Sequence, residues 1–305
     1  MADGPTLLLI TNPLAGAGDE SAIAEAVKVL RARADVRIAE CSDPRELRAA
    51  LGRREGRMPV VCGGDGSLNL LVGELRRRTE LADTDIGLIP LGTGNDLARG
   101  VGVPLAPEQA AATVLDGYGR PLDLLVADEG GVAVNAVHLG AGAEAARRAQ
   151  PFKSRLGRFA FPMGSLLAGL GMRGLRLKVI ADGRTLARRR VLMVGLANGP
   201  TIAGGRGKLA PRAVPDDGLV DVVVSAAIGP VARVGYALHL LRGVHEARAD
   251  VRTIRARRVV IIGEPFEYNA DGDLGGPVTH QCWRVEPQAW RLRVPQDQQV
   301  GGRNL

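Results

Sequence analysis

A glycine-rich turn lies where a buried strand passes into a helix, in the segment 60–75, VVCGGDGSLNLLVGEL. Glycines let the backbone approach a polyphosphate and direct its N–H groups toward it, and the start of the helix adds a positive dipole end. Asp65 would face such a phosphate across Mg²⁺ or a donor hydroxyl, which makes it a candidate for metal contact or proton acceptance. A tight connection without a ligand is the alternative. The candidate phosphate-binding residues are Gly63, Gly64, Asp65, Gly66, Ser67 and Asn69.

A second glycine-rich turn follows the next strand, in the segment 86–104, IGLIPLGTGNDLARGVGVP. The side chains of Thr93 and Asn95 could hydrogen-bond a nucleotide, and Asp96 could cap the following helix. Capping alone would explain Asn95 and Asp96, but two such turns in one sheet, each with an acid, favour a ligand. The candidate residues of this turn are Gly92, Thr93, Gly94, Asn95 and Asp96.

A third turn, ITNPLAGAG at 10–18, comes directly after the first predicted strand. Alone it is a weak turn signal. At the first strand end of the same sheet, it could form one wall of a phosphate pocket, with Asn12 as the candidate contact.

Short apolar runs alternate with helical patterns through the first half of the chain. Strand–helix alternation with glycines after the strands predicts a doubly wound parallel α/β sheet, and such sheets bind ligands at the carboxyl ends of their strands. The predicted strands are 6–11, 36–39, 59–62 and 86–91, and the predicted helices are 21–34, 44–51 and 68–78.

The pattern changes near Pro121, after which β-like runs are separated by turns. Asp182-Gly183 between two such runs is a hairpin signal, and this half is predicted to be a mostly antiparallel sandwich or barrel with helical insertions. The predicted strands are 123–127, 131–139, 175–181, 185–197, 220–226, 251–262 and 266–270, and the predicted helices are 143–150, 156–170 and 231–242.

Composition places the chain among globular proteins, because its 305 residues are 46% hydrophobic and suffice for two domains. Its 41 glycines follow no collagen period, and its three cysteines show no metal spacing. No apolar run approaches the roughly 18 residues of a transmembrane helix, and the N-terminal region lacks the basic start of a signal peptide. We therefore expect a cytoplasmic protein.

The net charge of +7 is uneven: residues 1–125 carry 14 basic and 18 acidic side chains (−4), and residues 126–305 carry 26 and 15 (+11). A basic surface could meet nucleic acid, anionic lipid or phosphate-bearing substrates, or serve solubility alone. Nucleic acid is disfavoured, because the few aromatic residues (3%) give few stacking platforms and no recognised nucleic-acid module appears.

Five motifs in this order resemble the diacylglycerol kinase catalytic domain of bacterial diacylglycerol kinase and sphingosine kinase-like lipid kinases. They are NPLAG, GGDGSLN, PLGTGND, APRAVPDDGLVDVVV (210–224) and NADGDLGG (269–276), and they span nearly the whole chain. NAD kinases share the first GGDG turn but not the GTGND and PDDG segments that follow.

The resemblance implies an NAD kinase/diacylglycerol kinase-like fold with two domains and an active site in the cleft between them. Residues 1–122 would form the ATP-binding α/β domain, and residues 288–305 are a candidate addition to it. Residues 123–287 would form a lipid-binding β-sandwich. Residues 63–69 would cradle the nucleotide phosphates, and Thr93 would touch the nucleotide.

The resemblance also implies a structural magnesium at the DDG segment. One carboxylate and neighbouring carbonyls hold it in the family, and hard oxygen ligands on a tight turn suit Mg²⁺. Read without the family, the segment is an ordinary turn. The implied ligands are Asp217, with its neighbour Asp216, and the carbonyl groups of Val214 and Leu219.

The proton acceptor of the family is the glutamate of a DGE motif, and that position is Asp273 here, one methylene shorter. Either the loop compensates or Asp271 or Asp65 takes more of the role. Ser67 stands where threonine is usual. Near 39–42, where the family often has a nucleotide-contacting threonine, Ser42 carries the only hydroxyl.

A basic cluster precedes an apolar, aromatic-bearing helical pattern and predicts peripheral docking on anionic lipid head groups, the alternative being a solvated face beside a core helix. The cluster consists of Arg147, Arg148, Lys153, Arg155 and Arg158. A homodimer is a candidate assembly.

The function expected from these observations is an ATP- and Mg²⁺-dependent lipid kinase acting at the membrane surface. Its simplest acceptor is the hydroxyl of diacylglycerol, giving phosphatidic acid. The alternatives are another hydroxyl lipid (a sphingoid base, phosphatidylglycerol or a specialised metabolite), or a nucleotide- or lipid-binding protein with impaired catalysis.

Overall fold

The computed structural model describes residues 4–13, 17–141 and 174–296. The chain forms two compact units, Met1–Leu122 with Gln288–Leu305, and Asp123–Pro287. The predicted helices at 143–150 and 156–170 and the basic cluster 147–158 lie outside the described residues. Among the helices that are described, none has the length and hydrophobicity needed to cross a bilayer.

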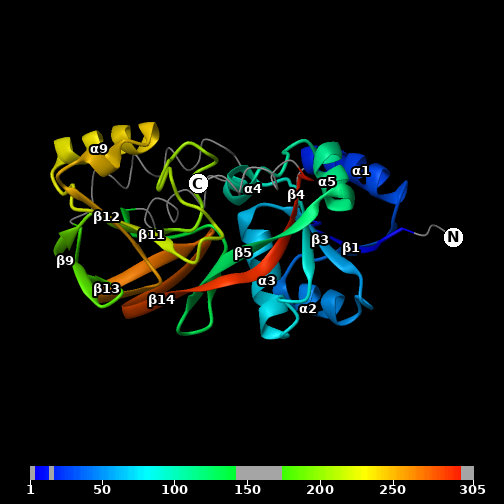
Figure 1. Ribbon diagram of the computed structural model, residues 1–305, viewed down its shortest axis with the longest axis horizontal. Helices are drawn as coiled ribbons and strands as arrows, with labels where there is room; N and C mark the ends of the chain where they lie inside the picture. The colour runs from blue at the N-terminus through cyan, green and yellow to red at the C-terminus, as the bar shows by residue number, and fades with distance from the viewer. Residues whose placement is uncertain (1–3, 14–16, 142–173, 297–305) are drawn as a thin grey trace. The chain divides into compact units, whose positions relative to one another are not determined.

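The first unit is built on a parallel sheet (Figure 1). Its strands are ordered β2-β1-β3-β4, and the final residues of β14 add a further parallel strand beside β4. The predicted parallel α/β sheet is therefore confirmed. The strands are β1 (Thr6–Thr11), β2 (Asp35–Glu40), β3 (Met58–Gly63), β4 (Asp85–Pro90) and β14 (Asp273–Val294).

Helices cover both faces of this sheet, as a doubly wound fold requires (Figure 1). On one face, α1 and α5 pack together over Leu7, Leu9 and Val60 of the strands. On the other, α2 and α3 pack together, and α3 contacts β3. The helices are α1 (Ala17–Arg31), α2 (Pro44–Gly52), α3 (Asp65–Arg77), α4 (Asp96–Val101) and α5 (Pro107–Asp116).

The second unit is an antiparallel β-sandwich. One sheet has the order β12-β11-β10-β7-β13, and β13 also pairs with β8, which pairs with β9. Asp182 and Gly183 join β8 to β9 with positive φ angles of 45° and 79°, so the predicted hairpin is confirmed. The strands are β5 (Tyr118–Ala127), β6 (Val132–Ala133), β7 (Ala136–Gly140), β8 (Leu175–Ala181), β9 (Arg184–Val191), β10 (Met193–Ala197), β11 (Val220–Ser225), β12 (Val251–Ala256) and β13 (Arg258–Ala270).

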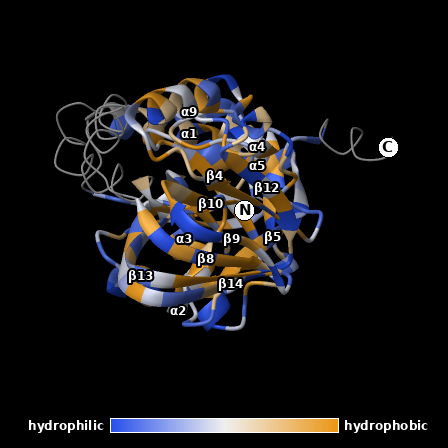
Figure 2. Ribbon diagram, turned by 90° about the vertical axis from the view of Figure 1, so that its left-hand side faces the viewer, coloured by the Kyte–Doolittle hydropathy of each residue, from blue (hydrophilic) through white to orange (hydrophobic). Residues whose placement is uncertain are grey.

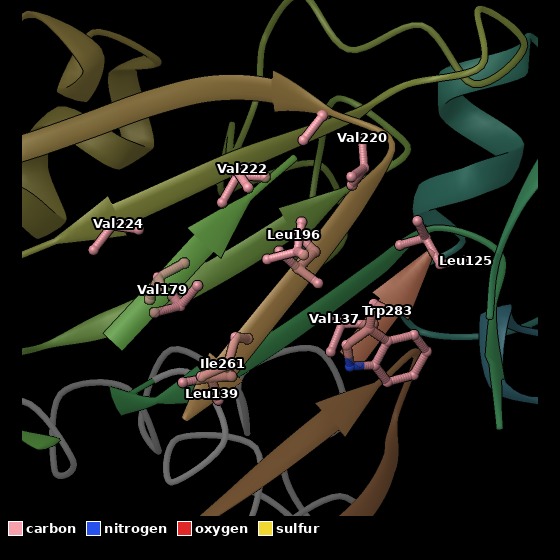
Figure 3. Packing of buried hydrophobic residues seen from close by; sticks show 14 of the residues in the cluster. Leu125, Val137, Leu139, Val179, Leu196, Val220, Val222, Val224, Ile261 and Trp283 are labelled. Atoms are coloured by element: carbon pink, nitrogen blue, oxygen red, sulfur yellow. The ribbon is translucent and has the colours of Figure 1, made fainter. Parts of the chain in front are cut away.

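The sandwich core follows from the two-residue period of its strands. Val220, Val222 and Val224 of β11 point inward together, and they meet Val179 and other apolar side chains of the facing strands (Figure 3). All residues of the central strand β10 are buried, and its ribbon is largely orange in Figure 2. The core therefore fixes the strands whose ends carry the DDG and DGD motifs.

Helix α9 (Pro230–Arg242) covers the other face of β10 and β11. Its Tyr236 packs there with Met193 and Val223, and the Tyr236 hydroxyl lies 3.4 Å from the Met193 sulfur. A short 3₁₀-helix, η3 (His245–Ala247), follows α9.

His138 of β7 is a buried imidazole on this same side of the sheet, opposite Gly195 and Asn269 in the strand registers. Within the described part of the chain, neither ring nitrogen has a hydrogen-bond partner. Burial lowers the pKa of His138 to about 4. The folded protein therefore holds this side chain neutral at neutral pH.

Folding stability should consequently fall as the pH drops from about 6.5 to about 4, because the unfolded chain binds a proton there that folded His138 does not. The loss in free energy of unfolding that His138 causes approaches about 3 kcal/mol at the acid end of this window. Urea unfolding of the wild type and His138→Gln at several pH values measures it. Identical pH slopes for the two proteins would contradict the assignment.

Candidate active site

The two glycine-rich turns of the first unit touch each other, backbone against backbone. The Leu91 amide N–H donates to the Gly63 carbonyl oxygen at 3.1 Å. A Cβ placed on Gly92 would lie 2.4 Å from the Gly64 Cα, closer than real Cβ atoms come to any neighbour. Only glycine fits at this contact, because any side chain would collide with the neighbouring backbone. The two turns, which were predicted separately, therefore form one surface at the ends of β3 and β4.

Asp65 ties these turns together through its side chain. Its carboxylate accepts from the backbone N–H of Asp96 at 2.9 Å and from that of Leu97 at 3.1 Å, one donor for each oxygen. Asp96 and Leu97 are the first two residues of α4. The N-cap residue of this helix, Asn95, makes no capping hydrogen bond with its own side chain. Burial raises the pKa of Asp65, while the hydrogen bond from Asp96 acts in the opposite direction. The geometry makes Asp65 a positioning residue that caps α4 from the neighbouring turn.

Replacing Asp65 with asparagine should lower the free energy of unfolding by about 1–2 kcal/mol, because an NH₂ group would face a backbone donor. Asp43 provides the matched control. It caps α2 through a single oxygen that accepts from both Arg45 and Glu46, so the Oδ1 of asparagine can replace it. Urea unfolding of Asp65→Asn and Asp43→Asn makes the comparison, and equal losses would refute the two-oxygen cap.

Two asparagines beside the turns hold buried acceptors that no donor satisfies among the described residues. Asn95 adopts a left-handed conformation (φ 54°), and its Nδ2 donates to the Gly92 carbonyl at 2.8 Å. The Oδ1 atoms of Asn95 and Asn69 are buried and find no hydrogen-bond partner in the described part of the chain. Unpaired buried acceptors are costly, so they fit a ligand that brings hydroxyl or amino donors, as a nucleotide does. Thr93 is exposed at the tip of its turn.

A pocket of about 110 Å³ opens at the carboxyl ends of β1, β2 and β3. Asn12, Ser42 and Ser67, from three separate segments, are among the residues that line it. The Ser42 hydroxyl donates to Glu46 at 2.7 Å, just before α2 begins. The pocket therefore joins the first and third predicted turns, at 60–75 and 10–18, and Ser42 also lies in its lining. The remaining lining residues are Ile10, Thr11, Cys41, Asp43, Pro44, Leu47, Val61, Cys62, Leu70 and Leu71.

The DDG segment of the second unit is held by a residue that the sequence analysis did not select. Asp123 is fully buried, its amide N–H donates to the Pro215 carbonyl at 2.7 Å, and its carboxylate accepts from the Gly218 N–H at 2.6 Å. The available signal was an acid inside the apolar run 122–127, where a buried charge needs partners. Asp123 therefore fixes the turn on which the candidate magnesium ligands sit.

Asp217 accepts from the Leu219 N–H at 3.0 Å and forms an ion pair with Arg255 of β12. No group of three or more His, Cys, Asp or Glu side chains that could hold a metal occurs among the described residues. A magnesium site here would therefore depend on one carboxylate and on the Val214 and Leu219 carbonyls. These hard oxygen donors fit Mg²⁺, and the carboxylate already attracts a cationic group. Asp216 is half-buried beside them.

The DGD turn between β13 and β14 separates its two aspartates. The Asp271 carboxylate accepts from the backbone N–H groups of Val134, Asn135 and Ala136 at 2.5 to 3.2 Å, and its own N–H donates to the Ala136 carbonyl. Asp271 therefore holds the turn in place. Asp273, the first residue of β14, is exposed. Of the two aspartates, Asp273 is the more exposed.

A parallel α/β unit with paired glycine-rich turns, followed by a β-sandwich, is the architecture of the NAD kinase/diacylglycerol kinase-like fold class. The family model of the diacylglycerol kinase catalytic domain matches residues 6–127. The model of the YegS C-terminal NAD kinase beta sandwich-like domain matches residues 135–294. The chain belongs to this family of lipid kinases, and membership implies ATP as its co-substrate.

Individual proteins agree with the family match. A protein of Xanthomonas oryzae pv. oryzae named "Probable lipid kinase YegS-like" is 31% identical over 93% of this chain and 95% of its own length. A diacylglycerol kinase of Mycobacterium tuberculosis is 27% identical over 94% of each chain. The crystal structure of a diacylglycerol kinase from Bacillus anthracis str. Sterne has a TM-score of 0.75 at 21% identity and covers 97% of this chain and 99% of that one, which shows the shared fold.

Proposed function

We propose that this protein transfers the γ-phosphoryl group of ATP to the hydroxyl of diacylglycerol, giving phosphatidic acid and ADP. The observation that carries the proposal is the close contact of the two glycine turns, with two buried acceptors beside it that have no partner among the described residues. The named diacylglycerol kinases among the relatives support this acceptor over other hydroxyl lipids.

The roles of the chain's own residues follow from general phosphoryl-transfer chemistry. Backbone N–H groups of residues 63–67 bind phosphate oxygens at the start of α3, and the Oδ1 atoms of Asn69 and Asn95 accept hydrogen bonds from nucleotide donors. The Asp273 carboxylate accepts the hydroxyl proton as the lipid oxygen attacks the γ-phosphorus. Asp65 and Asp271 hold their turns and stay out of the proton transfer. Bound Mg²⁺ would neutralise phosphate charge.

Incubation with γ-labelled ATP and a panel of pure lipids tests the acceptor. Label in phosphatidic acid from diacylglycerol supports the proposal. Label only in a sphingoid base, in phosphatidylglycerol or in an unassigned metabolite would show that this lipid, and not diacylglycerol, is the acceptor. ATP binding without any transfer would indicate a protein with impaired catalysis.

The magnesium assignment has its own test. We expect chelation of divalent ions to abolish transfer, and Asp217→Asn to raise the Mg²⁺ concentration needed for half-maximal rate by about tenfold, because a neutral amide is a weaker ligand for a hard cation. Asp216→Asn is the control and should shift it less. An unchanged Mg²⁺ requirement in Asp217→Asn would remove Asp217 from the metal site.

A further inference from the structure

Helix α9 exposes apolar side chains to solvent to an unusual degree. Among the described residues, ten large hydrophobic side chains are exposed, and five of them fall within 231–244. Val231 at the start of the helix is 85% exposed. We call this group the α9 stripe; it consists of Val231, Val234, Leu238, Leu241 and Val244.

The spacing of these residues places them together. Positions 231, 234, 238 and 241 are three or four residues apart and therefore lie on one side of the helix. The opposite side, with Ala232, Tyr236 and Leu240, packs on the sandwich. A surface helix needs only one apolar face, which packs on the protein core. A second apolar face therefore marks a surface that contacts another apolar partner.

The charges around the stripe are positive. Helix α9 itself carries Arg233 and Arg242 and no acidic residue. At its C-terminal end, the exposed Lys208 lies against Gly243, where an added Cβ would be 2.8 Å from the Lys208 Cδ. The acids that follow the helix are neutralised, since Glu246 pairs with Arg212 and Asp250 with Arg248.

We propose that the α9 stripe inserts into the boundary between head groups and acyl chains of an anionic bilayer. Apolar side chains on one helix face flanked by cationic ones are the composition of an interfacial helix, and Arg242 and Lys208 can reach head groups while their stems stay apolar. This proposal rests on the proposed function in one respect. A lipid kinase must contact the membrane, because its lipid substrate resides in the bilayer.

Sedimentation with vesicles of phosphatidylcholine and phosphatidylglycerol in equal parts tests the surface. Leu238→Gln with Leu241→Gln should lower the vesicle partition coefficient about tenfold or more. The matched control, Ile38→Gln with Ile262→Gln, alters exposed apolar side chains elsewhere and should leave it unchanged. Far-ultraviolet circular dichroism confirms that each variant is folded.

The charge contribution has a separate readout. Arg242→Gln with Lys208→Gln should lower partition onto the anionic vesicles about tenfold or more, and should change partition onto pure phosphatidylcholine little. Loss of equal size on both kinds of vesicle would overturn the electrostatic part of the proposal.

Two results would overturn the docking surface: wild-type protein that does not sediment with vesicles, or a leucine double variant that sediments like the wild type. A wild-type dimer that the leucine variant dissociates, with vesicle binding unchanged, would assign the stripe to a second copy of the chain. Phosphoryl transfer to short-chain diacylglycerol in free solution separates the two proposals. The leucine variant should retain this activity, whereas its absence in the wild type would refute the proposed function and leave vesicle binding to decide the docking surface.

Discussion

Replacing Asp273 with asparagine should reduce the turnover of lipid phosphorylation by about 100-fold or more, because the amide cannot accept the proton of the attacking hydroxyl. The KM for ATP should change little, since the proposed nucleotide site lies on the turns of the other unit. Steady-state kinetics with diacylglycerol and purified variants measures both quantities.

The control for this variant is Asp273→Glu, which restores the side-chain length of the glutamate in the DGE motif implied by the family resemblance. We expect it to keep turnover within a few-fold of the wild type. A near-wild-type rate for Asp273→Asn would exclude Asp273 as the base. Asp271→Asn should differ in kind: it weakens the bonds to the Val134–Ala136 backbone, so its loss of activity should come with a lower unfolding temperature.

Replacing Gly92 with alanine should be comparably damaging. The added Cβ would meet the Gly64 Cα at 2.4 Å and the Asn95 Oδ1 at 2.8 Å, so the two turns must separate. Overpacking of this kind costs about 1–3 kcal/mol. Because displaced backbone N–H groups no longer converge on the phosphates, we expect kcat/KM for ATP to fall about 100-fold.

Gly52→Ala is the matched control in the same unit, because the nearest atom to its added Cβ is the Arg78 Nη1 at 3.9 Å. It should leave ATP kinetics and stability near wild-type values. If Gly92→Ala also bound ATP normally and unfolded at the wild-type urea midpoint, the contact between the turns would have no role in nucleotide binding.

The regular elements of the first unit were largely readable from the sequence. The strand predicted at 6–11 is β1, since the apolar run ends at Asn12-Pro13. Helix α3 begins at Asp65, earlier than the predicted 68, because the glycine turn itself supplies the first helical residues. Strand β14 was missed, as charged residues and Pro287 interrupt its alternation, and Gln288 within it takes a positive φ of 49°.

The motifs pointed to the candidate residues, but the hydrogen bonds that hold these residues could not be predicted. Asp65 caps a helix that begins 31 residues later, and Asp271 binds a segment more than 130 residues earlier. No periodicity or local propensity encodes such partners, because the fold brings them together. Asp123 was overlooked for the same reason, since its partner in the DDG segment lies 95 residues away.

The hydrogen bonds from the start of α4 to Asp65 have a consequence for ATP binding. Because one carboxylate links the two turns, we expect them to move together, so that the proposed phosphate-binding backbone is already ordered before the nucleotide arrives. Little conformational entropy is then lost on binding, and the interaction energy goes into affinity and alignment. Hydrogen exchange at the Asp96 and Leu97 amides should accordingly be slow without ATP and change little when it is added.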